Sequence, residues 1–420
     1  MIFKKFFRRK KNAAPEGSSE NNEMFDADGT YEEEGETEKS DGVSGEENTE
    51  EKPIRMLLGS RAVVITGIVA GISLILSLIF LISPDFAELY SRTVGGFIRM
   101  VLAKITGIFP FSLAETLTFS FIVYVVYSII RSIYEAVKNV ENEKRFEIWS
   151  NRVIVCVLLT AYSLYNFSFA SCGFRYDLED NLGLDRKPLT AQQLYECIVL
   201  VEDEISECLD SGDIRHTPDG ASCLPYSYNE LNAVLNNCYE RAYEKYDFLN
   251  RFNSTAKRLA ISPIMTYTHI SGIYIPYTGE VNINTNYPDY VIAFSEAHEM
   301  AHQRGIARED EANFVAFLIM YESDDNYLRY CALTELFDYL ADALYQTDEE
   351  LFYSAAALCD IRLLEEIFAF SDFFAPYSNS TASVVMEVVN DTSIKLRGDS
   401  DGTKSYDMMI ELAAAYFGIE

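Results

Sequence analysis

The sequence predicts a mainly α-helical membrane protein in which three N-terminal transmembrane helices precede a mostly helical domain with a short β-ribbon. Three observations support this fold class. Apolar runs long enough to cross a bilayer lie within the first 170 residues. Apolar residues recur at helical spacing through most of the remainder. One stretch, Tyr267 to Ile283, differs because it is rich in Ile, Tyr, Thr and Val and is interrupted by glycines.

The composition indicates that apolar and acidic segments are separated along the chain. Hydrophobic residues make up 49% of the 420 residues, yet the formal net charge is −31. A chain of this length is expected to form two or three domains. Residues 16–51 contain fifteen acidic residues and one basic residue. Because such a segment cannot bury a core, residues 1–55 are predicted to be a disordered cytoplasmic tail, basic at its start and then acidic.

Three apolar runs predict membrane spans at about residues 62–82, 116–137 and 153–170, within a membrane domain at 56–173. The first run is uncharged over 21 residues, which is enough for one span on its own. Residues 94–111 combine apolar side chains with Arg99 and Lys104. We expect this segment to be amphipathic and to lie at the membrane interface.

The distribution of Lys and Arg predicts the orientation of these spans. Basic residues flank the first span on its N-terminal side and crowd the link between the second and third spans. The positive-inside rule places both regions in the cytoplasm. We therefore expect a multi-pass protein of the cell membrane, with the lipid bilayer as a partner, a cytoplasmic N-terminus and an extracytoplasmic C-terminal domain.

Residues 174–420 are predicted to form that outer domain. Apolar periodicity predicts helices at 191–208, 227–246, 325–345, 348–370 and 405–417. The stretch from Tyr267 to Ile283 is predicted to form one or two short strands with a turn, next to the segment that contains most of the candidate site residues. The edge of such a strand can pair with an extended peptide.

The candidate site is His298-Glu299-Met300-Ala301-His302, which has the H-E-x-x-H pattern. Positions i and i+4 share one face of a helix, so His298 and His302 can bind a single Zn²⁺ ion. Glu299 lies beside them and can act as general base toward a water molecule. The preceding residues are mostly apolar, and Gly305 can end the helix in a left-handed turn. Both features argue against a chance match on a solvated helix.

The third metal ligand is expected to be Glu309, with Glu311 as the alternative. A third histidine at position 308 would complete another zinc pattern, but this chain has Arg308 there. A Glu on a following helix is the ligand of the gluzincins, which this arrangement resembles. Glu309 is followed four residues later by Asn313, which could orient a ligand histidine, whereas Glu311 is followed at that spacing by Val315.

Other residues give weaker indications. His269, Tyr274, Tyr277 and Glu280 are candidates for lining a cleft, although a lone histidine is more often structural. Arg304 and Arg308 could stabilise an oxyanion but are more simply explained as ion-pair partners. The sequence contains no C-x-x-C, Gly-rich phosphate loop or basic nucleic-acid face. Seven cysteines follow the third span, and Cys197 with Cys208 or Cys223 with Cys238 could pair locally, or all seven could remain reduced.

The chain also resembles a bacterial family of membrane proteins known as domain of unknown function 3810. The resemblance covers roughly residues 60–418 and rests on the three early spans and on five motifs, which are I-F-P-F-S-L-A-E at 108–115, G-I-Y-I-P-Y-T-G-E at 272–280, A-H-E-M-A-H-Q-R-G-I-A-R-E-D-E-A-N at 297–313, V-N-D-T at 389–392 and G-T-K-S-Y at 402–406. It implies a zincin-like, zinc-dependent peptidase domain with an unknown peptide or protein substrate.

Three hypotheses follow from these patterns. The leading one is a membrane-anchored zinc metallopeptidase that hydrolyses peptide bonds by a metal-activated water. The second is a membrane-anchored sensor or scaffold that binds zinc without turnover. The third is a structural membrane protein in which the H-E-x-x-H pattern is fortuitous.

Overall fold

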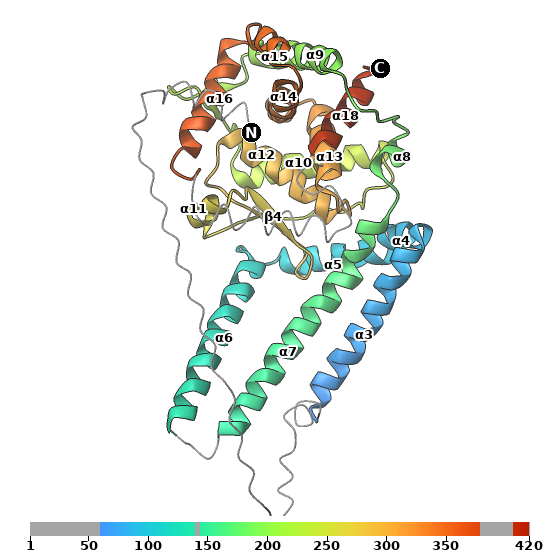
Figure 1. The fold of residues 1–420 in the computed structure, drawn as a ribbon, viewed down its shortest axis with the longest axis vertical. Helices are drawn as coiled ribbons and strands as arrows, with labels where there is room; N and C mark the ends of the chain where they lie inside the picture. Colours follow the sequence, from blue (N-terminus) through green and yellow to red (C-terminus); the bar gives the residue numbers. More distant parts are fainter. Residues whose placement is uncertain (1–58, 139–142, 379–405, 420) are drawn as a thin grey trace, which may run out of the picture.

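The computed structural model describes residues 59–138, 143–378 and 406–419. Three long helices form the lower part of the molecule, and a mostly helical domain lies at their upper end (Figure 1). The expected tail at 1–55 lies outside the described residues, as do the motif at 389–392 and nearly all of the motif at 402–406. The mainly α-helical fold class is confirmed.

Among the described residues, three helices are long and apolar enough to cross a membrane, at the places where the sequence predicts spans. They are α3 (Arg61–Ile82), α6 (Leu113–Lys138) and α7 (Glu143–Ser168). Helices α3 and α7 pack along each other and are joined by polar contacts, including a hydrogen bond of 2.8 Å between Ser77 Oγ and Asn166 Oδ1. Ser150 of α7 hydrogen-bonds to Ser128 of α6. Apart from such contacts, α6 and α7 present apolar side chains outward, as expected for helices in lipid.

The segment between α3 and α6 is mostly helical, and Arg99 is the residue in it that departs from the prediction. It forms α4 (Pro84–Tyr90), a π-helical turn η1 (Ser91–Gly95) and α5 (Gly96–Thr106), which lie between the spans and the outer domain (Figure 1). Arg99 does not face water or head groups but is fully buried. Its guanidinium donates to the main-chain oxygens of Ser168 and Ser91 and to Asn250 Oδ1. Lys104 is exposed, as are apolar side chains of the segment such as Phe97.

The C-terminal domain, for which the predicted name outer domain is kept as a label, is mostly helical, as expected. Its helical elements are η2 (Ala170–Phe174), α8 (Leu178–Leu182), α9 (Ala191–Asp210), α10 (Tyr228–Lys245), α11 (Ser262–Met265), η3 (Thr266–Thr268), α12 (Asp289–Gln303), α13 (Glu309–Tyr321), α14 (Asn326–Thr347), α15 (Glu349–Ala356), α16 (Ile361–Phe374) and α18 (Tyr406–Phe417).

The prediction of a single helix at 348–370 is wrong, because the chain forms two helices there. Asp348 caps α15 by accepting hydrogen bonds from the main-chain nitrogens of Glu350 and Leu351, each at 3.0 Å. Asp360 caps α16 in the same way through Arg362 N (2.8 Å). An Asp at the N-cap satisfies main-chain donors that the helix itself leaves free, so Asp360 starts a new helix.

The expected β-ribbon is confirmed and has one additional strand. Strands β4 (Gly272–Ile275) and β5 (Glu280–Ile283) pair antiparallel, with Tyr274 opposite Val281. Strand β3 (Lys257–Arg258) pairs parallel to the other side of β5, which gives the order β3-β5-β4. A separate small ribbon joins β1 (Arg215–His216) and β2 (Ser222–Cys223). Strand β4 is therefore an edge of the sheet in the described part of the chain.

Helix α12 runs through the middle of the outer domain. It contacts α13 and α14 on one side and strands β4 and β5 on the other, and most of its residues are buried. The apolar core that surrounds α12 and α13 includes Ala297, Ala301, Phe314 and Phe317. All eight cysteines are free thiols, so neither of the two local disulfides is present.

Carboxylates join the outer domain to the second span. Glu280 of β5 accepts hydrogen bonds from the main-chain nitrogens of Leu113 (3.0 Å) and Ala114 (2.6 Å) at the start of α6. Glu115 of α6 in turn accepts from the main-chain nitrogens of Ala260 (3.1 Å) and Ile261 (3.0 Å). A carboxylate suits the positive end of a helix, which explains the first contact. Glu280, a candidate cleft residue, is thus a buried cap of the second span.

Candidate metal centre

The two histidines of the H-E-x-x-H pattern lie on one face of α12. Their rings are 4.6 Å apart between centroids and nearly perpendicular, with an angle of 89°. The helix is buried because its other faces pack in the core, so the imidazoles are held by rigid surroundings. His298 keeps 13% of its side chain exposed and His302 keeps 6%. The pair is therefore preorganised but remains reachable from solvent.

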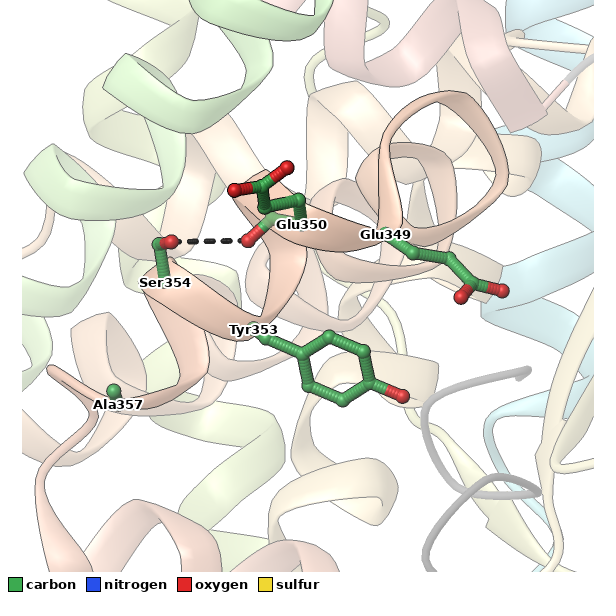
Figure 2. A pocket seen from close by; sticks show the side chains of 5 residues that line it. All are labelled: Glu349, Glu350, Tyr353, Ser354 and Ala357. Carbon is green, nitrogen blue, oxygen red and sulfur yellow. Dashed lines mark hydrogen bonds between the residues drawn. The ribbon is translucent and has the colours of Figure 1, made fainter.

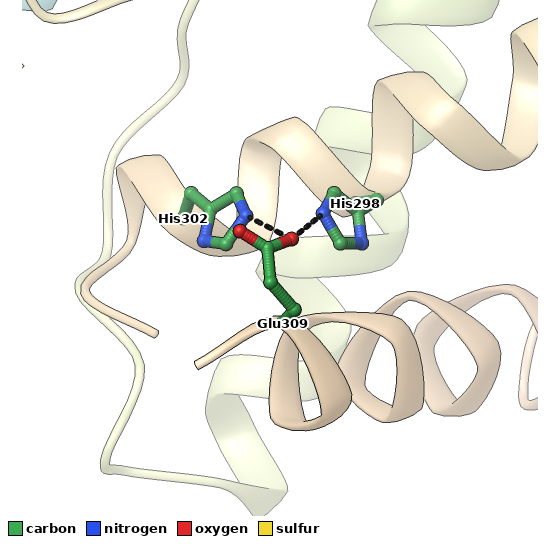
Figure 3. Close-up of side chains that lie close together, drawn as sticks. All are labelled: His298, His302 and Glu309. Atoms are coloured by element: carbon green, nitrogen blue, oxygen red, sulfur yellow. Dashed lines mark ion pairs between the residues drawn. The ribbon is translucent and has the colours of Figure 1, made fainter. Parts of the chain in front are cut away.

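A tight turn brings the third group of the cluster to these rings. Gly305 follows α12 with φ of +102°, a conformation that favours glycine, and lets the chain reverse into α13. Glu309, the first residue of α13, then faces α12 (Figure 3). Its Oε2 lies 3.3 Å from His298 Nε2 and 3.4 Å from His302 Nε2. The candidate ligand atoms of the three residues all lie within 4.8 Å of one another.

The donor set fits a zinc ion. Two imidazole nitrogens and one carboxylate oxygen are the ligands of many catalytic zinc sites, which leave a fourth position open. His302 Nδ1 lies 2.7 Å from the main-chain oxygen of Ile306, and an oxygen of this kind can only accept. The proton of the neutral ring therefore sits on Nδ1, and the lone pair of Nε2 points into the cluster. His298 Nδ1 is buried and has no partner among the described residues.

The electrostatics also favour binding of a cation. Burial by itself raises the pKa of Glu309, but the charge and hydrogen bonds of His302 and His298 act more strongly together and hold that pKa well below its usual value. Glu309 is consequently a carboxylate at neutral pH.

Glu311, the alternative third ligand, points elsewhere. Its carboxylate accepts a hydrogen bond from the main-chain nitrogen of Leu178 (2.8 Å) at the start of α8. Burial raises the pKa of Glu311 to about 7. Asn313 does not orient a ligand histidine, contrary to the expectation, although Glu309 itself lies beside both histidines. Asn313 Nδ2 donates to Tyr339 Oη (3.4 Å), and neither histidine is bonded to it.

Glu299 lies beside the edge strand β4. A Cβ atom added to Gly272, the first residue of β4, would lie 2.7 Å from Glu299 Cγ and 3.0 Å from Oε1. The main-chain nitrogen of Asn284 donates to Ser271 O (2.9 Å). Because main-chain groups alternate in direction along an antiparallel strand, those of Ile273 also face β5, whereas those of Gly272 face away from it. The candidate base is thus adjacent to main-chain groups at the outer edge of the sheet.

Gly272→Ala is expected to displace the Glu299 side chain without disturbing the histidines or Glu309. Its methyl group would overlap Glu299 Cγ, and a shift of about 1 Å in a positioned catalytic group can cost about 10²-fold in rate. The metallopeptidase hypothesis predicts that peptide hydrolysis falls by at least about tenfold while zinc content stays at the parent level. Gly71→Ala is the control, because a Cβ there meets nothing within 4 Å. Equal activity of the Gly272 variant and the parent would contradict this role of the glycine.

The remaining candidates have structural roles. His269 adopts φ of +60°, and its Nε2 lies 3.0 Å from Tyr377 O. Arg304 is buried, donates to the main-chain oxygens of Met300 and Phe252, and stacks on Tyr239, so the ion-pair interpretation is wrong for it. Burial lowers the pKa of Arg304 to about 10. Arg308 forms ion pairs, as expected, with Asp177 at 2.7 Å and Asp310 at 3.4 Å.

The two tyrosine candidates lie on the membrane side of the sheet. Tyr277 Oη lies 3.2 Å from Thr118 Oγ1 of the second span. Tyr274 is buried against Phe169, with ring centroids 5.3 Å apart. Phe169 also contacts His302, at 6.5 Å between centroids. Phe169 and Ile306 both contact a histidine of the cluster and were missed, because no local sequence signal marks them.

A hollow of the surface, separate from the histidine cluster, lies on α15 and is lined by Glu349, Glu350, Tyr353, Ser354 and Ala357 (Figure 2). Ser354 Oγ donates to the main-chain oxygen of Glu350 (2.9 Å), as is common within helices. Its lining contains no histidine and does not overlap the cluster of His298, His302 and Glu309. The described residues thus contain one group of side chains suited to a transition metal.

Comparison with known proteins identifies the family. The model of the family described as a protein of unknown function, DUF3810, matches residues 90–414, about three quarters of the chain. The chain belongs to the DUF3810 family. The matched region begins after the first span and includes the second and third spans, the sheet and the cluster on α12 and α13. Neither the curated proteins nor the solved structures contain a significant match to this DUF3810 chain.

Proposed function

We propose that this DUF3810 protein is a membrane-anchored zinc metallopeptidase with a zincin-like outer domain. The observation that carries the proposal is the convergence of His298, His302 and Glu309 beside Glu299 and the edge strand β4. His298, His302 and Glu309 would hold Zn²⁺. The third ligand comes from the helix after the H-E-x-x-H helix, as in gluzincins.

The chemistry proposed for the site is hydrolysis of a peptide bond. Zinc in this position supplies a Lewis acid that polarises a carbonyl and lowers the pKa of water. Glu299 accepts the proton that water loses on attack and passes it to the leaving amine. His302 keeps its orientation through the bond from Nδ1 to Ile306 O, and Glu309 contributes negative charge to the site.

The edge of β4 is the proposed binding surface for the main chain of the substrate. Main-chain groups of Gly272 and Tyr274 face away from β5, and no further strand pairs with this edge in the described ranges. An extended peptide can add to such an edge as an extra strand. Because Gly272 touches Glu299, a peptide on this edge would pass beside the proposed base.

We also propose that the outer domain is extracytoplasmic. The Lys and Arg distribution supports this orientation, and three spans place the two ends of the chain on opposite sides. A periplasmic-type reporter fused after residue 420 should be active, and the same reporter inserted at residues 139–142 should be inactive. The opposite pattern would place the site in the cytoplasm and overturn the proposed localisation.

The ligand assignment predicts that Glu309→Gln weakens zinc binding much more than Glu311→Gln. Only the carboxylate of Glu309 faces both imidazoles, whereas that of Glu311 accepts from Leu178 N. We expect at least a tenfold loss of zinc affinity for Glu309→Gln, in the range of about 10- to 100-fold known for changes near zinc sites. Titration with a competing chelator measures both values. A larger loss in the Glu311 variant would contradict the assignment.

A further inference from the structure

We infer that the substrate of this site is a polypeptide that is itself anchored in the bilayer, and that it is cut within a narrow interval above the membrane surface. The inference rests on the proposed peptidase function and names its substrate class. Three observations support it. The metal cluster lies next to the end of the third span, polar contacts fix this position, and an apolar rim lies at the same level.

The cluster lies directly above the third span. Helix α7 ends at Ser168, and the next residue, Phe169, packs its ring against both Tyr274 of the edge strand and His302 of the cluster. The candidate span itself reaches to Ser168. A bilayer core is about 30 Å thick, so the end of a helix of this length lies at the head-group level. The site is therefore within one or two side chains of that level.

Polar contacts hold the outer domain at this height. Arg99 binds the last carbonyl group of α7, and Ser168 Oγ donates to Pro276 O (3.2 Å) in the turn between β4 and β5. The start of α6 is held by the two carboxylates Glu280 and Glu115. A further contact joins the carboxylate of Glu88 on α4 to Arg175, in the segment after α7. These anchors attach to the outer ends of all three spans.

The contact between Arg175 and Glu88 is a bidentate ion pair. Arg175 Nε lies 2.9 Å from Glu88 Oε2, and Arg175 Nη2 lies 3.0 Å from Glu88 Oε1. Arg175 also donates to the main-chain oxygen of Gly305 (2.9 Å), in the turn that carries Glu309 to the histidines. Bidentate pairs of this type are geometrically specific. The metal cluster is thereby tied to the span ends through its own turn, so its height cannot vary freely.

An apolar rim lies where the domain meets the start of α6. Ile264 of α11 is 70% exposed and Ile108, in the loop before α6, is 78% exposed. Ile261 and Phe111 are also exposed in these two segments. Glu115 joins the segments by binding Ile261 N, so the rim continues the lipid-facing surface of α6. Such side chains are suited to the interfacial region of a bilayer, which would place this border of the domain among head groups.

These features favour a chain that emerges from the membrane next to the protein. A segment anchored in the same bilayer is confined to the membrane surface on which the site lies, so it meets the site more often than a peptide free in solution does. Only residues at the height of the cluster would reach it. A free peptide is neither confined to the membrane surface nor held at a fixed height.

The test compares anchored and free forms of one peptide library. The full chain is placed in vesicles of phosphatidylethanolamine and phosphatidylglycerol, and a mixed-sequence library is joined to a lipid or left free. Cleavage rates and cut positions are measured by mass spectrometry. We expect the anchored library to be cut at least about tenfold faster, with cuts grouped at a constant number of residues from the anchor. A flexible spacer of about ten residues should reduce this advantage.

Single substitutions test whether the anchoring contacts set the cut position and whether the apolar rim favours anchored substrates. Glu115→Gln removes the charge that binds Ala260 N and Ile261 N and should broaden the range of cut positions, with zinc content unchanged. Glu135→Gln is the matched control, because Glu135 lies on the same helix and pairs with Arg131 within it. Ile264→Asp should reduce the advantage of the anchored library, and Ile361→Asp, at a similarly exposed position on α16, should not.

The outcomes separate the two proposals. Equal cleavage of both libraries, or scattered cut positions, with activity that depends on Glu299, would overturn the inference and leave the peptidase function standing. If the zinc-loaded chain cuts neither library, the proposed function fails and the substrate class fails with it.

Discussion

Replacing Glu299 by Gln is expected to leave zinc content and folding near normal and to lower peptide hydrolysis by about 10²-fold or more, the scale typical of losing a positioned acid–base group. Gln has nearly the shape of Glu but cannot accept a proton at neutral pH. Glu299 is not one of the three residues whose ligand atoms converge, so the metal should remain bound. Its place beside Gly272 puts it next to the proposed substrate edge.

Glu296→Gln is the matched control for this variant. Glu296 lies on the same helix and is equally buried, but its carboxylate accepts a hydrogen bond from Asn232 Nδ2 (2.8 Å) on the far side of α12. We expect this change to leave hydrolysis within about twofold of the parent, because the group does not approach the cluster. If Glu299→Gln cleaves peptides as fast as the parent, the assignment of Glu299 as general base is wrong.

His302→Ala has the second large expected effect, loss of both metal and activity. His302 supplies one of two imidazole ligands, and two remaining protein ligands bind zinc poorly. The ring is also buried between His298 and Phe169, so some thermal stability should be lost with it. Bound zinc should fall below about a tenth of the parent value at equal free zinc.

His269→Ala distinguishes loss of the site from loss of any packed imidazole ring. His269 packs on Phe374 and binds Tyr377 O, but it is not part of the cluster. This variant should lose stability yet keep its zinc. Retention of full zinc by His302→Ala would show that the metal, if present, binds elsewhere.

Features with a local cause could be predicted from the sequence. Long apolar runs mark the spans because a bilayer demands about twenty apolar residues, and the two histidines share a face because of helical periodicity. The break at Asp360 also had a local signal, the preference of Asp for the N-cap, which the apolar periodicity of 348–370 concealed.

Features that depend on distant contacts could not be predicted. Nothing near Glu280 in sequence indicates that it caps α6, and nothing near Arg99 indicates burial beneath the outer domain. Glu309 and Glu311 differ in the neighbour that each carboxylate meets. The carboxylate of Glu309 meets the imidazoles, and that of Glu311 meets the main-chain nitrogen of Leu178. The sequence favours Glu309 because Asn313 could orient a ligand histidine, but Asn313 hydrogen-bonds to Tyr339 instead.

The contacts between spans and outer domain also determine how the protein should be studied. Arg99, Glu88 and Glu115 lie before residue 174, yet each binds a residue after it. Removing residues 1–173 would leave buried partners such as Arg175 and Glu280 without their counterparts, which is costly. Metal and activity measurements are therefore best made on the full chain in detergent or vesicles.

Zinc content per chain, measured on the purified full-length protein after dialysis against a weak chelator, tests the central claim most directly. The proposed site predicts about one zinc ion per chain, which is the stoichiometry of a mononuclear site with three protein ligands. It also predicts that a variant lacking both His298 and His302 retains none. A parent protein without bound divalent metal, or equal zinc in the parent and the double variant, would contradict the metal centre and the peptidase function built on it.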